Sequence, residues 1–271
     1  MGTFGRYRAC MALTAALLTS TWLSVPALAA DDMIEQLESR GTIRVCLAED
    51  NPWQFKDPST GEWSGLVKEM IVQFAADLEL KLEEVNSSWK TAIQSLNTGE
   101  CDIVGANLFG SVKRSKLILF SDPWAYETST AYVKADSSYK SFAELDQPGK
   151  TIVTKAGTAT HDFAARFFKQ ATVKPLPNDT DVVLLGEVAS GRADAFWNSS
   201  SKAGPLLDAN PQFGVRAIGE EPTDKIPMIW GIGKGQYAFQ QLVNVWVNQY
   251  ISSGKMAEAW EKWFKTEYVG D

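Results

Sequence analysis

The sequence predicts an α/β protein with two lobes, each built on a mostly parallel β-sheet flanked by helices. Strand-like and helix-like segments alternate along the chain with short connections, which is the order that parallel sheets require. The same order starts again near residue 150, and two linking segments lie where the chain would pass between the two units. Such lobes would face each other across a cleft at the carboxyl ends of their strands, where open α/β sheets bind ligands.

The first unit begins at residues 42–48 (TIRVCLA), an apolar run that is typical of a buried strand. Residues 64–80 predict a helix, because apolar residues recur there at helical spacing: Leu66, Met70, Ile71, Phe74 and Leu78. A strand (81–88), a second helix (89–100) and another strand (101–106) follow. Gly99 stands near the end of the second helix, where a left-handed residue can cap it.

The second unit repeats this order with a strand at residues 150–157 and a helix at 158–170. The segment 172–177, a helix (179–191) and a strand (193–199) come next. The linking segments are 125–138 and 218–228, and two helices in 236–265 close the chain. Those helices carry an apolar stripe expected to face the core, made of Met256, Trp260, Trp263 and Phe264. We therefore expect one lobe from residues 30–126 and 222–271, and the other from 127–221.

The first 29 residues predict a secretory signal peptide. Arg6 and Arg8 precede an apolar stretch from about residue 11 to 23, and Ala27-Leu28-Ala29 forms a small-residue cleavage site. A membrane anchor is the alternative, but the stretch is short and is broken by polar residues and Pro26. We expect cleavage after Ala29 and a periplasmic mature protein.

The charge of the chain argues against some classes of binding partner, and its cysteines leave the question of a disulfide open. The chain has 26 Lys and Arg against 33 Asp and Glu, a net charge of −7, and no basic run, which argues against binding to nucleic acid or an anionic membrane. Cys46 and Cys101 remain after removal of the signal peptide. An oxidising compartment permits a bridge between them, but strand offset could equally leave two free thiols.

Several segments, in their order and spacing, resemble a known family. They are residues 41–55 (GTIRVCLAEDNPWQF), 87–124, 141–163 (including AGTATHDF), 188–200 (VASGRADAFWNSS) and 253–264. Together they are similar to the periplasmic solute-binding proteins of ABC transporters, polar amino-acid type (bacterial extracellular solute-binding protein family 3). The resemblance implies the type II periplasmic-binding-protein fold, hinge closure, and delivery of a small carboxylate-bearing solute to a membrane permease. We expect a monomer without catalytic residues, metal or cofactor.

Arg114 matches the family's arginine that binds the ligand carboxylate, just before the segment FSDP. A guanidinium binds a carboxylate through two parallel hydrogen bonds, although a solvated surface arginine would fit the spacing alone. The preceding turn includes Asn107 and Phe109, which we expect in the site. Trp89 matches the aromatic residue that covers the ligand side chain, or else it is the buried start of a helix.

The loop after the first strand places Glu49, Asp50 and Trp53 toward the cleft. In the second lobe, Thr158 and Ala159 open a helix after Gly157, and helix N-termini attract anions. The resemblance puts a carboxylate oxygen there, while Thr158 can also be an N-cap. His161 lies in the first turn of this helix as a structural or a ligand-binding residue.

Ser199 departs from the family pattern, which has an aspartate at this position to pair with the ligand's α-ammonium. A hydroxyl carries no charge, so either Glu49 or Asp50 replaces that aspartate or the ligand has no α-amino group. Lys202 follows and would suit a second negative group.

Two other functions remain open. Residues 146–149 (DQPG) and the segment LPNDTDV resemble cyclohexadienyl dehydratases, but the acid that their chemistry needs is matched here by Ser199 and Lys202. The segments IRVCLAEDNPWQF and GECD resemble solute-binding-like partners of quinoprotein dehydrogenases, in which case the ligand site could be lost.

Overall fold

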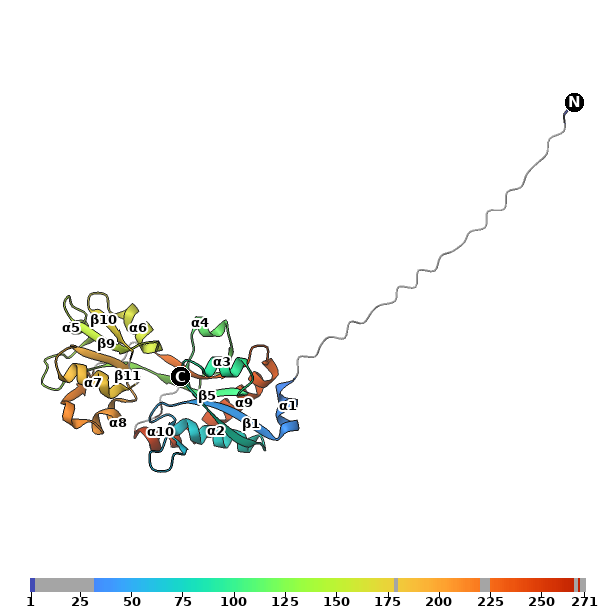
Figure 1. The fold of residues 1–271 in the computed structure, drawn as a ribbon, viewed down its shortest axis with the longest axis horizontal. Helices are drawn as coiled ribbons and strands as arrows, with labels where there is room; N and C mark the ends of the chain where they lie inside the picture. Colours follow the sequence, from blue (N-terminus) through green and yellow to red (C-terminus); the bar gives the residue numbers. More distant parts are fainter. Residues whose placement is uncertain (3–31, 178–179, 220–224, 266–267, 269–271) are drawn as a thin grey trace. The chain divides into compact units, whose positions relative to one another are not determined.

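Two sheets divide the computed structural model into two lobes (Figure 1). The structure describes residues 1–2, 32–177, 180–219, 225–265 and 268, and the features below belong to the compact unit Asp31–Asp271. Nearly all of the expected signal peptide, residues 1–29, lies outside the described residues.

The first lobe is built on a six-stranded sheet. Its strands are, in spatial order, β4 (Lys81–Ser87), β1 (Thr42–Ala48), β5 (Ile103–Phe109), β13 (Ile226–Ile232) and β6 (Leu119–Phe120), with β7 (Ala125–Glu127) also paired with β13. Its helices are α1 (Met33–Arg40), α2 (Leu66–Asp77), α3 (Ala92–Asn97), α4 (Val112–Ser115), α9 (Tyr237–Ser252) and α10 (Lys255–Phe264). A small hairpin joins β2 (Phe55–Lys56) to β3 (Trp63–Ser64).

The second lobe is built on a five-stranded sheet. The spatial order of its strands is β10 (Thr172–Leu176), β9 (Thr151–Lys155), β11 (Ala195–Ser199), β8 (Ser129–Lys134) and β12 (Val215–Ala217). Its helices are α5 (Phe142–Leu145), α6 (Ala159–Phe167), α7 (Asp181–Ala189), α8 (Ala203–Asp208) and the short 3₁₀ helix η1 (Pro211–Phe213). The predicted strand–helix order of both lobes is confirmed.

Each sheet contains one described strand that runs against its neighbours. In the first lobe β13 is antiparallel to β5, and in the second lobe β8 is antiparallel to β11, while β1 with β5 and β9 with β11 are parallel. The reversed strand β8 lies within the linking segment 125–138, and β13 begins in the other linking segment, 218–228, and continues beyond it. Those segments therefore complete the sheets as well as joining them, and the domain boundaries given above stay a prediction.

Helical periodicity explains how α2 packs on the first sheet. Leu66, Met70, Ile71 and Phe74 are at most 1% exposed and form the core with residues of α9 and α10 from the far end of the chain. Figure 1 shows these C-terminal helices beside α1 and α2. Leu78 follows the helix and is only partly buried.

The open question about the cysteines is resolved by the structure. Cys46 of β1 forms a disulfide with Cys101, which lies just before β5, and the two Cα atoms are 5.6 Å apart. Because β1 and β5 are neighbours in the sheet, the bridge links two adjacent strands within a buried cluster of the first lobe. Gly99, with φ +75°, is the expected left-handed residue after α3.

Candidate functional site

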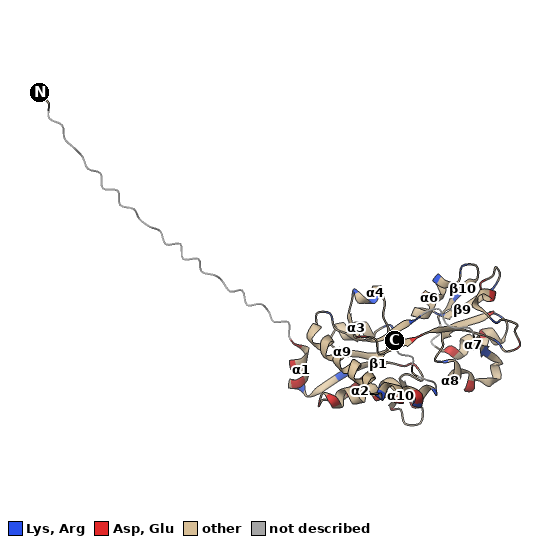
Figure 2. Ribbon diagram, turned by 180° about the vertical axis from the view of Figure 1, so that it is seen from behind, with Lys and Arg blue, Asp and Glu red and all other residues tan. Residues whose placement is uncertain are grey.

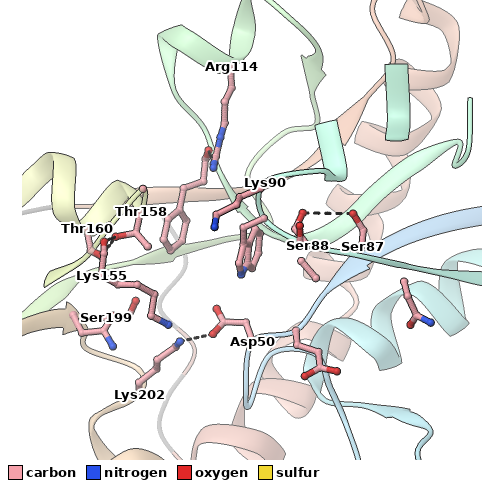
Figure 3. Close-up of a pocket in the computed structure, with 18 of the residues that line it drawn as sticks. Asp50, Ser87, Ser88, Lys90, Arg114, Lys155, Thr158, Thr160, Ser199 and Lys202 are labelled. Atoms are coloured by element: carbon pink, nitrogen blue, oxygen red, sulfur yellow. Dashed lines mark hydrogen bonds and ion pairs between the residues drawn. The ribbon is translucent and has the colours of Figure 1, made fainter. Parts of the chain in front are cut away.

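A cavity of about 610 Å³ lies between the two lobes, in the size range of small-molecule sites (Figure 3). Five parallel strands end at its wall, and the last residue of each lines it: Ala48, Ser87, Phe109, Lys155 and Ser199. This is where strand polarity places ligands in open α/β sheets. The cleft expected from the sequence is therefore present.

Arg114 lines the cavity and is positioned by its own short helix. Ser111 caps α4 by accepting a hydrogen bond from the backbone nitrogen of Arg114 (3.2 Å). The guanidinium donates to the carbonyl oxygen of Phe109 at 2.8 Å and, within the described part of the chain, forms no ion pair. Burial lowers its pKa, although the charge of Asp162 opposes that effect. The structure thus presents a partly desolvated guanidinium to the cavity, as a carboxylate-binding arginine requires.

Asp50 also lines the cavity, and buried amides hold it in place. Asn107 donates to one carboxylate oxygen of Asp50 (2.9 Å), and Gln54 donates to Asn107 (2.8 Å) and to the carbonyl of Ala48 (2.7 Å). Asn107 is 4% exposed and is not among the lining residues. We expected it in contact with ligand, but the structure places it behind Asp50 as a support.

The other oxygen of Asp50 forms an ion pair with the ammonium of Lys202, which comes from the second lobe (Figure 3). The ammonium also lies 3.3 Å from Asp181, whose second oxygen is 2.9 Å from Lys155. A row of alternating charges therefore runs from Asp50 across the cleft to Lys155. Sequence reasoning missed Asp181 and Lys155. Lys155 could have been found because it lies near the carboxyl end of the predicted strand 150–157, whereas nothing local marks Asp181.

Burial of Lys202 disfavours its charged form, but the negative charges of Asp50 and Asp181 outweigh this and raise the pKa of the ammonium above its usual value. Burial likewise disfavours the charged form of Asp181, but the charges of Lys202 and Lys155 prevail and lower the pKa of the carboxyl. Lys202 and Asp181 are therefore both charged at neutral pH.

The N-terminus of α6 meets the cavity through Thr158 and Thr160. Thr158 caps the helix by accepting from the backbone nitrogen of His161 (3.2 Å), and its hydroxyl donates to the carbonyl of Lys155 (2.8 Å). The capping role is thus present, and Ala159 is not among the lining residues. His161 pairs through Nδ1 with the hydroxyl of Thr154 at 2.8 Å, and it too does not line the cavity.

The aromatic residues separate into two groups. Trp89 is 37% exposed, precedes α3 and lines the cavity together with Phe109, so it is not the buried start of a helix. Trp53 does not face the cleft as expected. Its side chain is fully buried against Trp124, Trp260 and Phe264, since the turn after Asp50 directs it into the first-lobe core.

Ser199 and Asn198, at the end of β11, line the second-lobe wall and are 4% and 6% exposed. Tyr132 donates to the backbone carbonyl of Ser199 (2.6 Å). The side-chain nitrogen of Asn198 is buried without a hydrogen-bond partner among the described residues. Sequence reasoning did not select Asn198, although its position next to Ser199 would have justified it.

The described residues offer neither a metal site nor a membrane span. In the described ranges, no group of three or more His, Cys, Asp and Glu residues is arranged to hold a metal ion. The helices of the same ranges are also too short or too polar for a membrane span.

Comparisons with known proteins agree with this architecture. The family model of the bacterial extracellular solute-binding proteins, family 3, matches residues 43–266. The ABC transporter glutamine-binding protein GlnH of Bacillus subtilis is 26% identical over 78% of this chain and 77% of its own.

Two further relatives connect binding proteins with an enzyme. Cyclohexadienyl dehydratase of Pseudomonas aeruginosa is 22% identical over 95% of this chain and 92% of its own. The crystal structure of the ancestral amino acid-binding protein AncCDT-1, a precursor of cyclohexadienyl dehydratase, superposes with a TM-score of 0.74 at 30% identity, covering 86% of this chain and 99% of that one. By its family match, its two α/β lobes and the cavity between them, the chain belongs to the bacterial extracellular solute-binding proteins of family 3.

Proposed function

We propose that this protein binds a small carboxylate-bearing solute, an amino acid or a related acid, in the periplasm and delivers it to an ABC transporter permease. The observation that carries the proposal is the guanidinium of Arg114 in the cavity between the lobes, without an ion-pair partner in the described part of the chain. A carboxylate would complete two of its hydrogen bonds. The family membership and the relatives that bind amino acids support the same class of ligand.

In this proposal each lobe contributes a defined set of groups. Arg114, Phe109, Trp89 and Asp50 act from the first lobe, and Thr158, Ser199 and Lys202 act from the second. Asn107 orients Asp50 from behind. The protein acts as a monomer with a cleavable signal peptide, and the two connections between the lobes serve as its hinge.

A thermal-shift screen of amino acids, amines and organic acids tests the proposal. A ligand that binds only the folded protein stabilises it by RT ln(1 + [L]/Kd), which is about 2.7 kcal/mol at a concentration of 100 Kd. We expect carboxylates, but not the corresponding amides or amines, to raise Tm. A shift of the same size with compounds that lack any carboxylate would contradict the proposal.

Dehydratase activity is the second candidate, because the Pseudomonas relative covers nearly the whole chain. That chemistry needs a proton donor in contact with the substrate. The described acids that line the cavity are Glu49 and Asp50, and both oxygens of Asp50 are occupied by Lys202 and Asn107. Incubation with prephenate and arogenate, followed by ultraviolet absorbance, would detect turnover, and we expect none.

A further inference from the structure

The cavity has a charge of opposite sign to that of the protein. Five cationic side chains line it, Lys56, Lys90, Arg114, Lys155 and Lys202, against two acidic ones, Glu49 and Asp50, so the described lining carries a net charge of +3 (five minus two). The whole chain has a net charge of −7. Figure 2 shows acidic residues on outer helices such as α1 and α10. A cationic cleft in an anionic protein attracts anions.

Both carboxylate oxygens of Asp50 are already engaged within the protein. One of its oxygens pairs with Lys202, the other accepts from Asn107, and its carboxylate is largely buried. An α-ammonium at this position would displace the ammonium of Lys202, which is only 8% exposed and would then lose its first-lobe partner. An unpaired buried charge is costly, so the protein's own lysine competes with a ligand amine here.

The second-lobe wall instead offers donors in excess of acceptors. In the described part of the chain, Lys155 has one carboxylate partner, Asp181, which also pairs with Lys202, so hydrogen-bond donors of Lys155 remain available to a ligand. The nearby side-chain nitrogen of Asn198 is buried and has no partner among the described residues. In Figure 3, Arg114 lies on the opposite side of the drawn site from Lys202 and Asp50, with Lys155 on the second-lobe side. Two separate sets of donors thus face one cavity.

We propose that the solute is a small organic acid with two anionic groups and no α-ammonium. One carboxylate binds Arg114, and the second is received by Lys155, Asn198 and Lys202, while Lys202 takes the place of a ligand ammonium at Asp50. Glu49 is exposed, so it does not provide the desolvated partner that a buried amine needs. The inference rests on the proposed function and specifies the substrate class of the same site.

A comparison of dicarboxylates with monocarboxylates and amino acids tests this inference. Titration calorimetry would compare dicarboxylates of four to six carbons, such as succinate, glutarate and 2-oxoglutarate, with the monocarboxylate butyrate and the amino acids glutamate, glutamine and lysine. We expect at least one dicarboxylate to bind about tenfold or more tightly than every monocarboxylate and every amino acid in the set.

Variants then assign the second anionic group. Lys155→Met and Lys202→Met should each weaken the preferred dicarboxylate by about tenfold or more, whereas Lys140→Met, at an exposed second-lobe position, should leave its Kd unchanged. Circular dichroism and Tm of each variant verify that it is folded, and Asn198→Ala provides a test that leaves the charged row intact. Tighter binding of glutamate, glutamine or lysine than of any dicarboxylate without an amino group would overturn this inference and leave the proposed function standing. Absence of binding by every carboxylate tested would overturn both.

Discussion

The ammonium of Lys202, from the loop before α8 in the second lobe, is ion-paired with the carboxylate of Asp50, from the loop after β1 in the first. The pair crosses the cleft, and its two residues are 152 positions apart in the sequence. Because the pair joins one lobe to the other, it favours the arrangement in which the lobes lie together. Its consequences are open to measurement.

Asp50→Asn should open the ligand-free protein. The variant removes the first-lobe charge that attracts Lys202, while Asn107 and Gln54 still hold the loop. We expect small-angle scattering to give a larger radius of gyration for the ligand-free variant than for the wild type, and a smaller radius for both once ligand is saturating. Glu49→Gln is the matched control, since Glu49 forms no described ion pair. Identical scattering of all three proteins with and without ligand would count against hinge closure.

Ser199→Asp should change ligand preference. The substitution places an acid on the second-lobe wall beside the cavity, where Ser199 is 4% exposed. A new carboxylate repels an anionic group and can pair with an ammonium. We expect weaker binding of the preferred dicarboxylate and stronger binding of α-amino acids, measured by calorimetry. Unchanged affinities for both the dicarboxylate and the α-amino acids would contradict this expectation.

The buried carboxyl of Glu127 should make the free energy of unfolding depend on pH. This residue of β7 is 2% exposed, and burial raises its pKa to about 7, although hydrogen bonds from Ser201 and Thr128 and the charge of Lys202 oppose that rise. Between about pH 4.5 and pH 7, therefore, the Glu127 carboxyl keeps its proton in the folded state but releases it in the unfolded state, where its pKa is 4.5. The resulting stabilisation is complete below about pH 4.5 and is lost as the pH rises through about 7.

Glu127→Gln should remove this dependence. The shift corresponds to roughly 3 kcal/mol, so the variant should gain stability relative to the wild type at about pH 8 and little at about pH 5. Urea unfolding at the two pH values measures the difference. Asp122→Asn, at a partly exposed first-lobe carboxyl, is the control. A difference between variant and wild type that stays constant with pH would show that the Glu127 carboxyl titrates at its ordinary pKa.

The disulfide should contribute substantially to stability. It closes a loop with a sequence separation of 55, for which loop-closure entropy predicts about 4 kcal/mol. Cys46→Ala combined with Cys101→Ala should lower the free energy of unfolding by an amount of that order, with some added loss from packing. Reduction of the wild type with dithiothreitol before unfolding gives the comparison without any substitution. Equal unfolding midpoints for oxidised and reduced protein would contradict the expectation.

Local periodicity was sufficient to predict the strands and helices that form the two lobes, because each buried face repeats over a short stretch such as Leu66 to Phe74. Asp50, Phe109, Thr158 and Ser199 lie at or just after the ends of predicted strands, and all four line one cavity. These positions follow from strand polarity, which the sequence order determines.

The side-chain positions that the sequence did not predict depend on contacts between residues far apart in the chain. Trp53 lies only three residues after Asp50, yet its indole packs against Trp260 and Phe264, more than 200 positions away in the sequence. Lys155 and Asp181 meet across the second lobe, and no local pattern relates them. Periodicity does not distinguish β8 or the start of β13 from a link, because short strands at the crossing between lobes have no regular apolar pattern.

Calorimetry on Arg114 tests the central claim, that the cleft binds a carboxylate, most directly. The wild type, Arg114→Ala and Lys113→Ala would be titrated with the strongest ligand from the thermal-shift screen, and Lys113 is the control because it is exposed on the same short helix. Loss of a desolvated charge partner should cost Arg114→Ala about 2–5 kcal/mol of binding free energy, which is on the order of 30-fold or more in Kd, while Lys113→Ala should bind as the wild type does. An Arg114→Ala protein that is folded and retains the wild-type Kd would contradict the claim.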